Sequence, residues 1–278
     1  MTTTNPFLDE TWMPRYDAMT PELCAEALTA ALPVARRALG RAERRPETSW
    51  EGLLVAPMLA VRPVFEIWGA LSHLTSVANT EAWRAVEAAW LPKVVALSQR
   101  LSQSRAIYEG LTALLAEGKG LEPWQRHVAE RTAQGMRLAG VGLPPEKRRS
   151  FNAAQAKLSR LSLKFSNQVL DAERETRVEV ASGEEAGIPG DLLQGKGPWQ
   201  LGVDFATFDA VMRHAESAAV RERFWRARAG RASSGKGNNA PLIERILALR
   251  QEQAGLLGMA DFAHVSTAQK MAGTPRAV

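Results

Sequence analysis

The histidines are the residues that could hold a catalytic metal ion. A hydrolytic zinc site built on one helix needs two His one turn apart with a Glu beside the first, so that both imidazoles face one ion. His73, His127, His214 and His264 lie far apart in the sequence. His127 and Glu130 share a helix face, but a carboxylate-rich metal site needs two such pairs and the sequence has one. We therefore expect a polar surface pair there, and we predict neither a metal-binding nor a catalytic residue.

Two further segments have the composition of a reactive site. Cys24 is predicted on or beside the apolar face of the first helix, which favours a structural cysteine over a nucleophile. Residues 235–240, Gly-Lys-Gly-Asn-Asn-Ala, have the spacing of a phosphate-binding turn, but the helix around Trp225 precedes them where such a fold needs a strand. We expect a flexible loop with an Asn cap on the next helix. A Gly-x-Ser-x-Gly elbow, which a serine hydrolase would need, does not occur.

The composition favours a soluble globular protein. The 35 Lys and Arg are spread among 30 Asp and Glu, and the net charge is only +5. Solvated helix faces explain this pattern better than a nucleic-acid partner. We find no uninterrupted apolar run long enough to cross a bilayer, and the polar start is not a secretory signal. A single cysteine excludes an intrachain disulfide and favours the reducing cytoplasm. We thus expect no nucleic-acid and no membrane partner.

Apolar residues recur at helical spacing along most of the chain. Thr20, Ser49 and Thr80 are predicted N-caps. Helices are predicted from Pro21, from Trp50, from Glu81, over about 105–116, from Pro123, after Pro145, from about Phe205, over 218–229 and over 241–257. Residues predicted to face inward include Leu23, Ala27, Ala30, Ala31 and Val34 in the first helix, Trp50, Leu53, Leu54, Met58, Val61, Phe65, Trp68 and Leu71 in the second, and Trp124, Val128 and Met136 in the fifth. Pro57 and Pro63 are expected to kink or break the second helix, and Pro92 is expected to kink the third.

The helical spacing of apolar residues ends after residue 172. Residues 177–181 and 199–203 are predicted to pair as an antiparallel β-ribbon around a Gly-rich loop. The expected organisation is an extended lead-in (1–20), a helical domain (21–172), a ribbon-and-loop insertion (173–204) and a helical segment (205–278) that leads toward a catalytic domain outside this sequence. Thr274-Pro275 is a helix start at the very end of the chain, which is typical of a truncated sequence.

Short stretches along nearly the whole sequence together resemble one protein family. They are Asn-Pro-Phe-Leu at 5–8, Thr-Ser-Trp-Glu-Gly-Leu at 48–53, Ser-His-Leu-Thr-Ser-Val-Ala-Asn at 72–79, Gly-Val-Gly-Leu-Pro at 140–144, Leu-Ser-Arg-Leu at 158–161, Phe-Ser-Asn-Gln-Val-Leu-Asp-Ala at 165–172, Ile-Leu-Ala-Leu-Arg at 246–250, Leu-Leu-Gly at 256–258 and Lys-Met-Ala at 270–272. In order and spacing they resemble the N-terminal, non-catalytic region of the M3 zinc oligopeptidases, such as oligopeptidase A and thimet oligopeptidase. This resemblance implies a mostly α fold, the multi-helix N-terminal region of the oligopeptidase, with the small ribbon near 177–203.

The resemblance also implies a function. In the family, zinc and the His-Glu-x-x-His helix belong to a catalytic region beyond the point where this sequence stops, so no catalytic or metal residue is carried over and no substrate-binding residue is assigned. The chain is expected to form one wall of a channel that admits short peptides, to hold no zinc and to be inactive alone. Expected partners are short peptides and a separate catalytic-domain chain. The alternative is a stand-alone helical peptide- or protein-binding module that has lost catalysis.

Overall fold

The computed structural model describes residues 5–9, 13–44, 46–117 and 120–278. This part of the chain is mostly helical and contains one two-stranded sheet, which confirms the predicted fold class. The chain divides into two compact units, Met1–Ser159 with Arg250–Val278 (unit 1) and Arg160–Leu249 (unit 2). The domain boundaries expected near residues 20, 172 and 204 stay predictions, because compactness does not show which segments fold independently.

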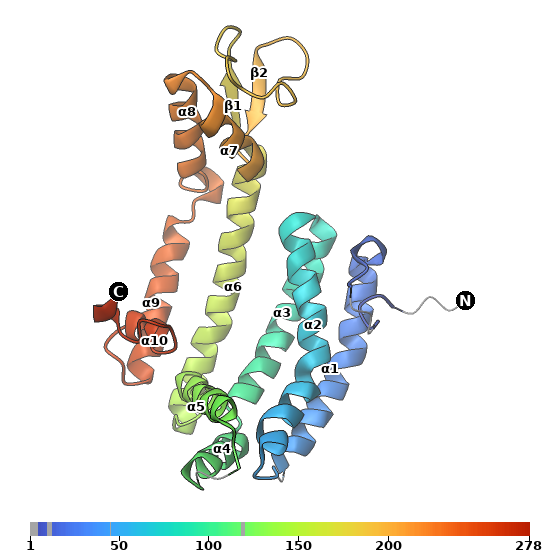
Figure 1. Cartoon of the computed structure of the whole chain (residues 1–278), viewed down its shortest axis with the longest axis vertical. Helices are drawn as coiled ribbons and strands as arrows, with labels where there is room; N and C mark the ends of the chain where they lie inside the picture. The colour runs from blue at the N-terminus through green and yellow to red at the C-terminus, as the bar shows by residue number, and fades with distance from the viewer. Residues whose placement is uncertain (1–4, 10–12, 45, 118–119) are drawn as a thin grey trace. The chain divides into compact units, whose positions relative to one another are not determined.

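Three long helices form the main body of unit 1. Helix α1 (Pro21–Arg44), a π-helical turn η2 (Glu51–Val55) that leads into α2 (Ala56–Val77), and α3 (Glu81–Ser102) pack against one another (Figure 1). A short 3-10 turn, η1 (Tyr16–Ala18), precedes them. The three predicted N-caps are confirmed: the Thr20, Ser49 and Thr80 hydroxyls accept hydrogen bonds from backbone N–H groups at 3.0–3.4 Å. Each such cap stabilises its helix by about 1 kcal/mol.

The core of unit 1 lies between these helices and α4 (Arg105–Glu117). Leucine and isoleucine side chains are almost completely removed from solvent, among them Leu28, Leu39, Ile67, Leu71, Leu97 and Leu111. Burial of one such side chain contributes roughly 1.5–3 kcal/mol. The core therefore fixes the helices whose outer surfaces form the pockets of unit 1.

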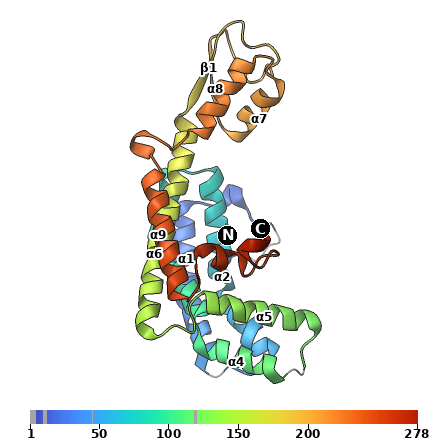
Figure 2. The ribbon, with the colours of Figure 1, turned by 90° about the vertical axis from the view of Figure 1, so that its left-hand side faces the viewer.

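Shorter elements complete unit 1. Helix α5 (Pro123–Leu138) packs on α4 (Figure 2) and ends before Gly140, whose φ of +88° is a left-handed conformation that favours glycine. The start of α6 (Pro145–Glu175) and the end of α9 (Ala240–Leu256) also belong to this unit. Helix α10 (Phe262–Thr267) and the 3-10 turn η4 (Pro275–Ala277) follow. The Gln269 side chain donates to the Arg131 carbonyl at 2.8 Å and ties this last segment to α5.

The helices that contain prolines are continuous. Helix α2 continues through Pro63 and α3 through Pro92, so the break considered at Pro63 is absent from the described α2, whereas the expected kinks stay predictions. Pro57 lies one residue after the winding changes from π to α. Proline lacks the N–H that would bond to the carbonyl four residues earlier, and its ring crowds that carbonyl. The wider π turn just before Pro57 accommodates this restriction without ending the helix.

Several residues predicted to face inward are instead exposed. These are Ala30 and Val34 in α1, Met58 in α2, and Trp124 and Val128 in α5. The inward face of α1 is centred on Cys24, Leu28 and Leu39, about one residue away from the predicted stripe. The apolar residues of these helices extend around more than one face, so spacing alone does not select the buried one.

Although the sequence has no uninterrupted apolar run of bilayer length, one described helix is long and apolar enough on average to cross a membrane. The helical stretch Glu51–Val77 has 27 residues, with an 18-residue window of mean hydropathy 1.5. The ion pair between Arg62 and Glu66, 2.7 Å apart, interrupts the apolar run but offsets little of the mean. A third of the window is buried inside the structure, and core helices of soluble proteins pass the same test. The buried side chains of α2, such as Val64 and Ile67, belong to the core of unit 1, where α2 packs on α1 and α3.

Unit 2 contains the predicted ribbon. Strands β1 (Arg177–Val180) and β2 (Trp199–Gly202) pair antiparallel, with Val178 opposite Leu201, which confirms the predicted pairing. Helices α7 (Phe205–His214) and α8 (Ala218–Ala229) pack beside the ribbon and close a small core around Phe224. The 3-10 turn η3 (Gly235–Gly237) and the start of α9 complete the unit.

Candidate functional sites

The structure places the four histidines on the surface, with His73, His127 and His264 in unit 1 and His214 in unit 2. His73 stacks on Tyr16 with ring centroids 5.0 Å apart, and the His264 ring lies 2.8 Å from the Asp261 carboxylate that caps α10. His127 and His214 are exposed on α5 and α7. Within the described ranges, no three His, Cys, Asp or Glu side chains converge as a metal site would require. The donors present there do not fit a zinc ion.

Glu130 of the His127–Glu130 pair forms an ion pair with Arg126. Glu130 is exposed, and its carboxylate lies 4.0 Å from the Arg126 guanidinium one turn earlier on α5. His127 lies on the lining of an apolar groove described below. The pair is therefore part of a solvated helix surface, as expected from the sequence.

Cys24 is a structural residue. It is fully buried in the core between the long helices, and burial raises the pKa of its thiol to about 12. A thiol with such a pKa is neutral at physiological pH and is a poor nucleophile.

The glycine loop at 235–240 pairs some of its backbone donors internally. Asn238 Oδ1 accepts from the N–H of Ala240, the first residue of α9, at 2.9 Å, whereas Oδ1 of Asn239, at the N-cap position, has no partner, so the expected Asn cap is not formed among these described residues. The N–H of Asn239 donates to the Ala232 carbonyl at 2.8 Å. Because α8 precedes the loop, the loop lacks the strand that comes before a phosphate-binding turn of this spacing.

An apolar groove of about 710 Å³ lies in unit 1 between η2, the start of α2 and α5. The rings of Trp50 and Trp124 meet edge to face beside it, with centroids 5.1 Å apart. The exposed side chains of Met58, Leu59 and Val128 line it. The sequence analysis assigned Met58 and Val128 to the core and did not recognise a groove. Its chemistry suits apolar side chains of a peptide or a partner helix.

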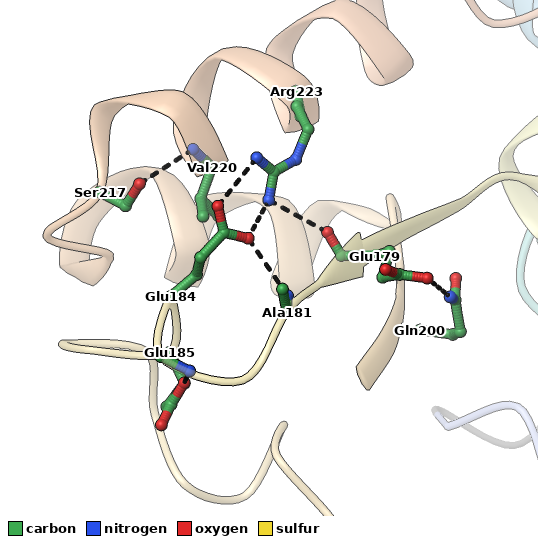
Figure 3. Close-up of polar contacts among 9 residues, drawn as sticks. Glu179, Ala181, Glu184, Glu185, Gln200, Ser217, Val220 and Arg223 are labelled. Atoms are coloured by element: carbon green, nitrogen blue, oxygen red, sulfur yellow. Dashed lines mark hydrogen bonds and ion pairs between the residues drawn. The ribbon is translucent and has the colours of Figure 1, made fainter. Parts of the chain in front are cut away.

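Ion pairs in unit 2 are structural. Figure 3 shows Arg223 of α8 bridging the Glu184 carboxylate and the Glu179 carbonyl, which it reaches at 3.2 Å. Glu184 also accepts from the N–H of Ala181 at 3.1 Å. The hydrogen bond from Arg223 lowers the pKa of the Glu184 carboxyl, so this carboxylate stays ionised and fastens the loop after β1 to α8.

The sequence of the chain can be compared with those of known proteins. The family "Neurolysin/Thimet oligopeptidase, N-terminal domain" matches residues 28–148, and "Peptidase family M3" matches residues 211–278. The "Probable cytosolic oligopeptidase A" of Arabidopsis thaliana is 31% identical, over 98% of this chain and 42% of the relative. "Oligopeptidase A" is 33% identical in Salmonella typhimurium and 32% in Escherichia coli, in each case over 99% of this chain and 43% of the relative.

The chain thus spans about two fifths of the length of the curated relatives that it matches. The two family matches follow one another along the sequence, the N-terminal domain first. The resemblance inferred from the sequence is confirmed: the chain belongs to peptidase family M3 and corresponds to an N-terminal region of its oligopeptidases.

Proposed function

We propose that this chain is the helical N-terminal part of a zinc-dependent oligopeptidase that hydrolyses short peptides. It forms one wall of the substrate channel and is inactive by itself. It works with a catalytic region supplied by further polypeptide, either in the same protein or as a separate chain.

One observation carries this proposal. Identity of 31–33% extends over 98–99% of the chain but over only 42–43% of each relative named oligopeptidase A. The matched part begins with the N-terminal domain and reaches into the M3 peptidase family only from residue 211 onward. The described residues do not fit a zinc ion, so we assign the chain to binding and positioning rather than to bond cleavage.

The apolar groove supports a role in peptide binding. Met58, Leu59 and Val128 offer a surface on which apolar side chains of a substrate can pack. Burying one such side chain contributes roughly 1.5–3 kcal/mol. We also propose a cytoplasmic location, in line with the cytosolic name of one plant relative, although another relative is named chloroplastic/mitochondrial.

The test compares the chain alone with a chimera. In the chimera, this chain replaces the matched region of the Salmonella oligopeptidase A. An internally quenched short peptide reports hydrolysis, and elemental analysis reports bound zinc. We expect no hydrolysis and no stoichiometric zinc for the chain alone, and hydrolysis by the chimera. A tightly bound zinc ion with peptidase activity in the chain alone would disprove the proposal. A chimera with an unrelated helical domain of the same length is the control.

The second candidate is a stand-alone helical module that binds peptides or proteins without catalysis. The exposed apolar groove favours it, since a groove of this size is within the range of ligand pockets. An inactive chimera, together with saturable binding of apolar peptides to the native chain, would select this alternative.

A further inference from the structure

A second pocket of unit 1 has a different lining. It encloses about 420 Å³ between α3, α6, the end of α9 and α10. Four glutamines line it, together with apolar side chains such as Phe151 and Phe262. None of the described residues that line it carries a charge. The pocket therefore favours an uncharged ligand that forms hydrogen bonds with amides.

Two side-chain amides at one wall of the pocket, Gln103 and Asn152, form hydrogen bonds with each other. The Gln103 amino group donates to Asn152 Oδ1 at 2.6 Å and to the Ala139 carbonyl at 2.8 Å. The Asn152 amino group returns a hydrogen bond to Gln103 Oε1 at 3.1 Å. This reciprocal pair fixes one side of the pocket.

The second pair of amides, Gln155 and Gln253, is joined by a single hydrogen bond. Gln253 is 4% exposed, and its amino group donates to Gln155 Oε1 at 3.0 Å. Among the described residues, nothing donates to Gln253 Oε1 and nothing accepts from the Gln155 amino group. If the O and N assignments of both side chains are exchanged, one carbonyl and one amino group are still left over. Gln253 Oε1 is not among the fully buried atoms that lack a hydrogen-bond partner, so it is accessible and can accept a hydrogen bond from water or from a ligand.

An open acceptor and an open donor on neighbouring amides match a peptide backbone. In an extended peptide, the N–H and the C=O of one residue point to the same side, as they do between paired strands. The N–H of such a residue would donate to Gln253 Oε1, and its C=O would accept from the Gln155 amino group. The side chain of that residue would lie against the apolar walls formed by Phe151 and Phe262.

We propose that this pocket binds the backbone of one apolar residue in an extended, uncharged peptide segment. The hydrogen bonds proposed for this pocket need neither a catalytic region nor a metal ion. Such binding therefore goes beyond the proposed function, and it holds whether or not the chimera is active.

The test uses the full chain and two small probes. The first is N-acetyl-leucine N-methylamide. The second is its depsipeptide analogue, in which an oxygen atom replaces the leucine N–H. Binding is followed by the NMR signals of the side-chain amides of Gln155 and Gln253. We expect saturable binding of the first probe and about tenfold or more weaker binding of the analogue, because the analogue leaves the Gln253 carbonyl unpaired.

Variants test whether the preference for the amide probe over the depsipeptide depends on Gln155 and Gln253. In the double variant Gln155→Leu/Gln253→Leu, both partners are replaced by apolar groups of similar size, which preserves folding better than removing one. Its binding, followed through backbone amide signals of the pocket, should differ by less than about twofold between the two probes. The control Gln194→Leu changes an exposed glutamine of unit 2 and should keep the full preference.

Two results would overturn the proposal. One is equal affinity of the native chain for both probes. The other is the absence of saturable shifts at the pocket residues. The comparison of probes on the native chain decides the matter even if the double variant fails to fold. Peptidase activity is not measured at any step, so the outcome is independent of the test of the proposed function.

Discussion

At the scale of single residues, Glu87 is a carboxylate in an unfavourable place. It lies on α3 and is 9% exposed, and desolvation raises the pKa of its carboxyl. Because this pKa is raised in the folded state, the contribution of Glu87 to the free energy of unfolding is fully present below its unfolded pKa of about 4.3. That contribution is lost as the pH rises through the folded pKa. We expect Glu87→Gln to increase the free energy of unfolding at pH 7 and to have little effect at pH 4.

Urea denaturation at the two pH values measures this difference. The control is Glu26→Gln, which changes an exposed carboxylate on α1 and should alter stability by less than about 0.5 kcal/mol at either pH. Equal stability of native chain and Glu87→Gln at pH 7 would contradict the assignment.

Phe224 and Trp225 are adjacent aromatic residues with opposite environments. Phe224 is fully buried among apolar side chains of the ribbon and α7, whereas Trp225 is 55% exposed. We expect Phe224→Ala to lower the free energy of unfolding of unit 2 by about 3–5 kcal/mol through lost burial and a cavity. Trp225→Ala should cost less than about 1 kcal/mol. Hydrogen exchange at the β1 and β2 amides measures the loss of unfolding free energy in both variants. Similar losses for Phe224→Ala and Trp225→Ala would contradict a core centred on Phe224.

The same residues show what a sequence can reveal at this scale. Caps such as Thr20 and Thr80 were predictable because they depend on local chemistry. The exposure of Trp124 was not, because it depends on which face of α5 another helix covers. The open amide of Gln253 was also beyond sequence reasoning, since its partner Gln155 is about a hundred positions away in the chain.

At the scale of elements, the loop between the two strands depends on Gly187. Its φ is +82°, and a Cβ there would lie 2.0 Å from the backbone carbonyl oxygen of His214 at the end of α7. We expect Gly187→Ala to destabilise unit 2 by about 2 kcal/mol or more, because both the backbone conformation and the close approach exclude a side chain.

Gly190 provides the matched control in the same loop. A Cβ at this position would meet nothing within 4 Å, and Gly190→Ala should change stability by less than about 0.5 kcal/mol. Chemical denaturation of the two variants measures the contrast. A Gly187→Ala variant as stable as Gly190→Ala would mean that the loop does not dock on α7 in this way.

Most helices were predictable from periodicity, because apolar spacing over ten or more residues is a strong signal. The two four-residue strands were predicted as a pair around a Gly-rich loop. The π turn before Pro57 was not, since the pattern shows where a helix is restricted but not how its winding adapts. Helix α10 was missed because its six residues are too short for a period to emerge.

At the scale of the whole molecule, the long helix α6 explains why the compact units were not predictable. Its residues up to 159 belong to unit 1, and those from 160 belong to unit 2. An uninterrupted apolar repeat gives no sign of such a division, whereas the change of texture after residue 172 is visible in the sequence. That the chain binds no zinc stays a prediction, because a metal site can form from residues that are far apart in the sequence.

The groove of unit 1 gives the last prediction. When no peptide occupies the groove, the side chains of Met58 and Leu59 are exposed. Two copies of the chain can then bury these surfaces against each other, because removing apolar area from water is favourable. We expect sedimentation to show concentration-dependent self-association of the chain alone. Met58→Lys/Leu59→Lys should shift the chain toward the monomer by about tenfold or more in dissociation constant, since burial of each side chain is worth roughly 1.5–3 kcal/mol. Val34→Lys, which changes an exposed apolar residue of α1 outside the groove, should leave association unchanged. A native chain that stays monomeric at all concentrations would show that this groove does not need a protein partner.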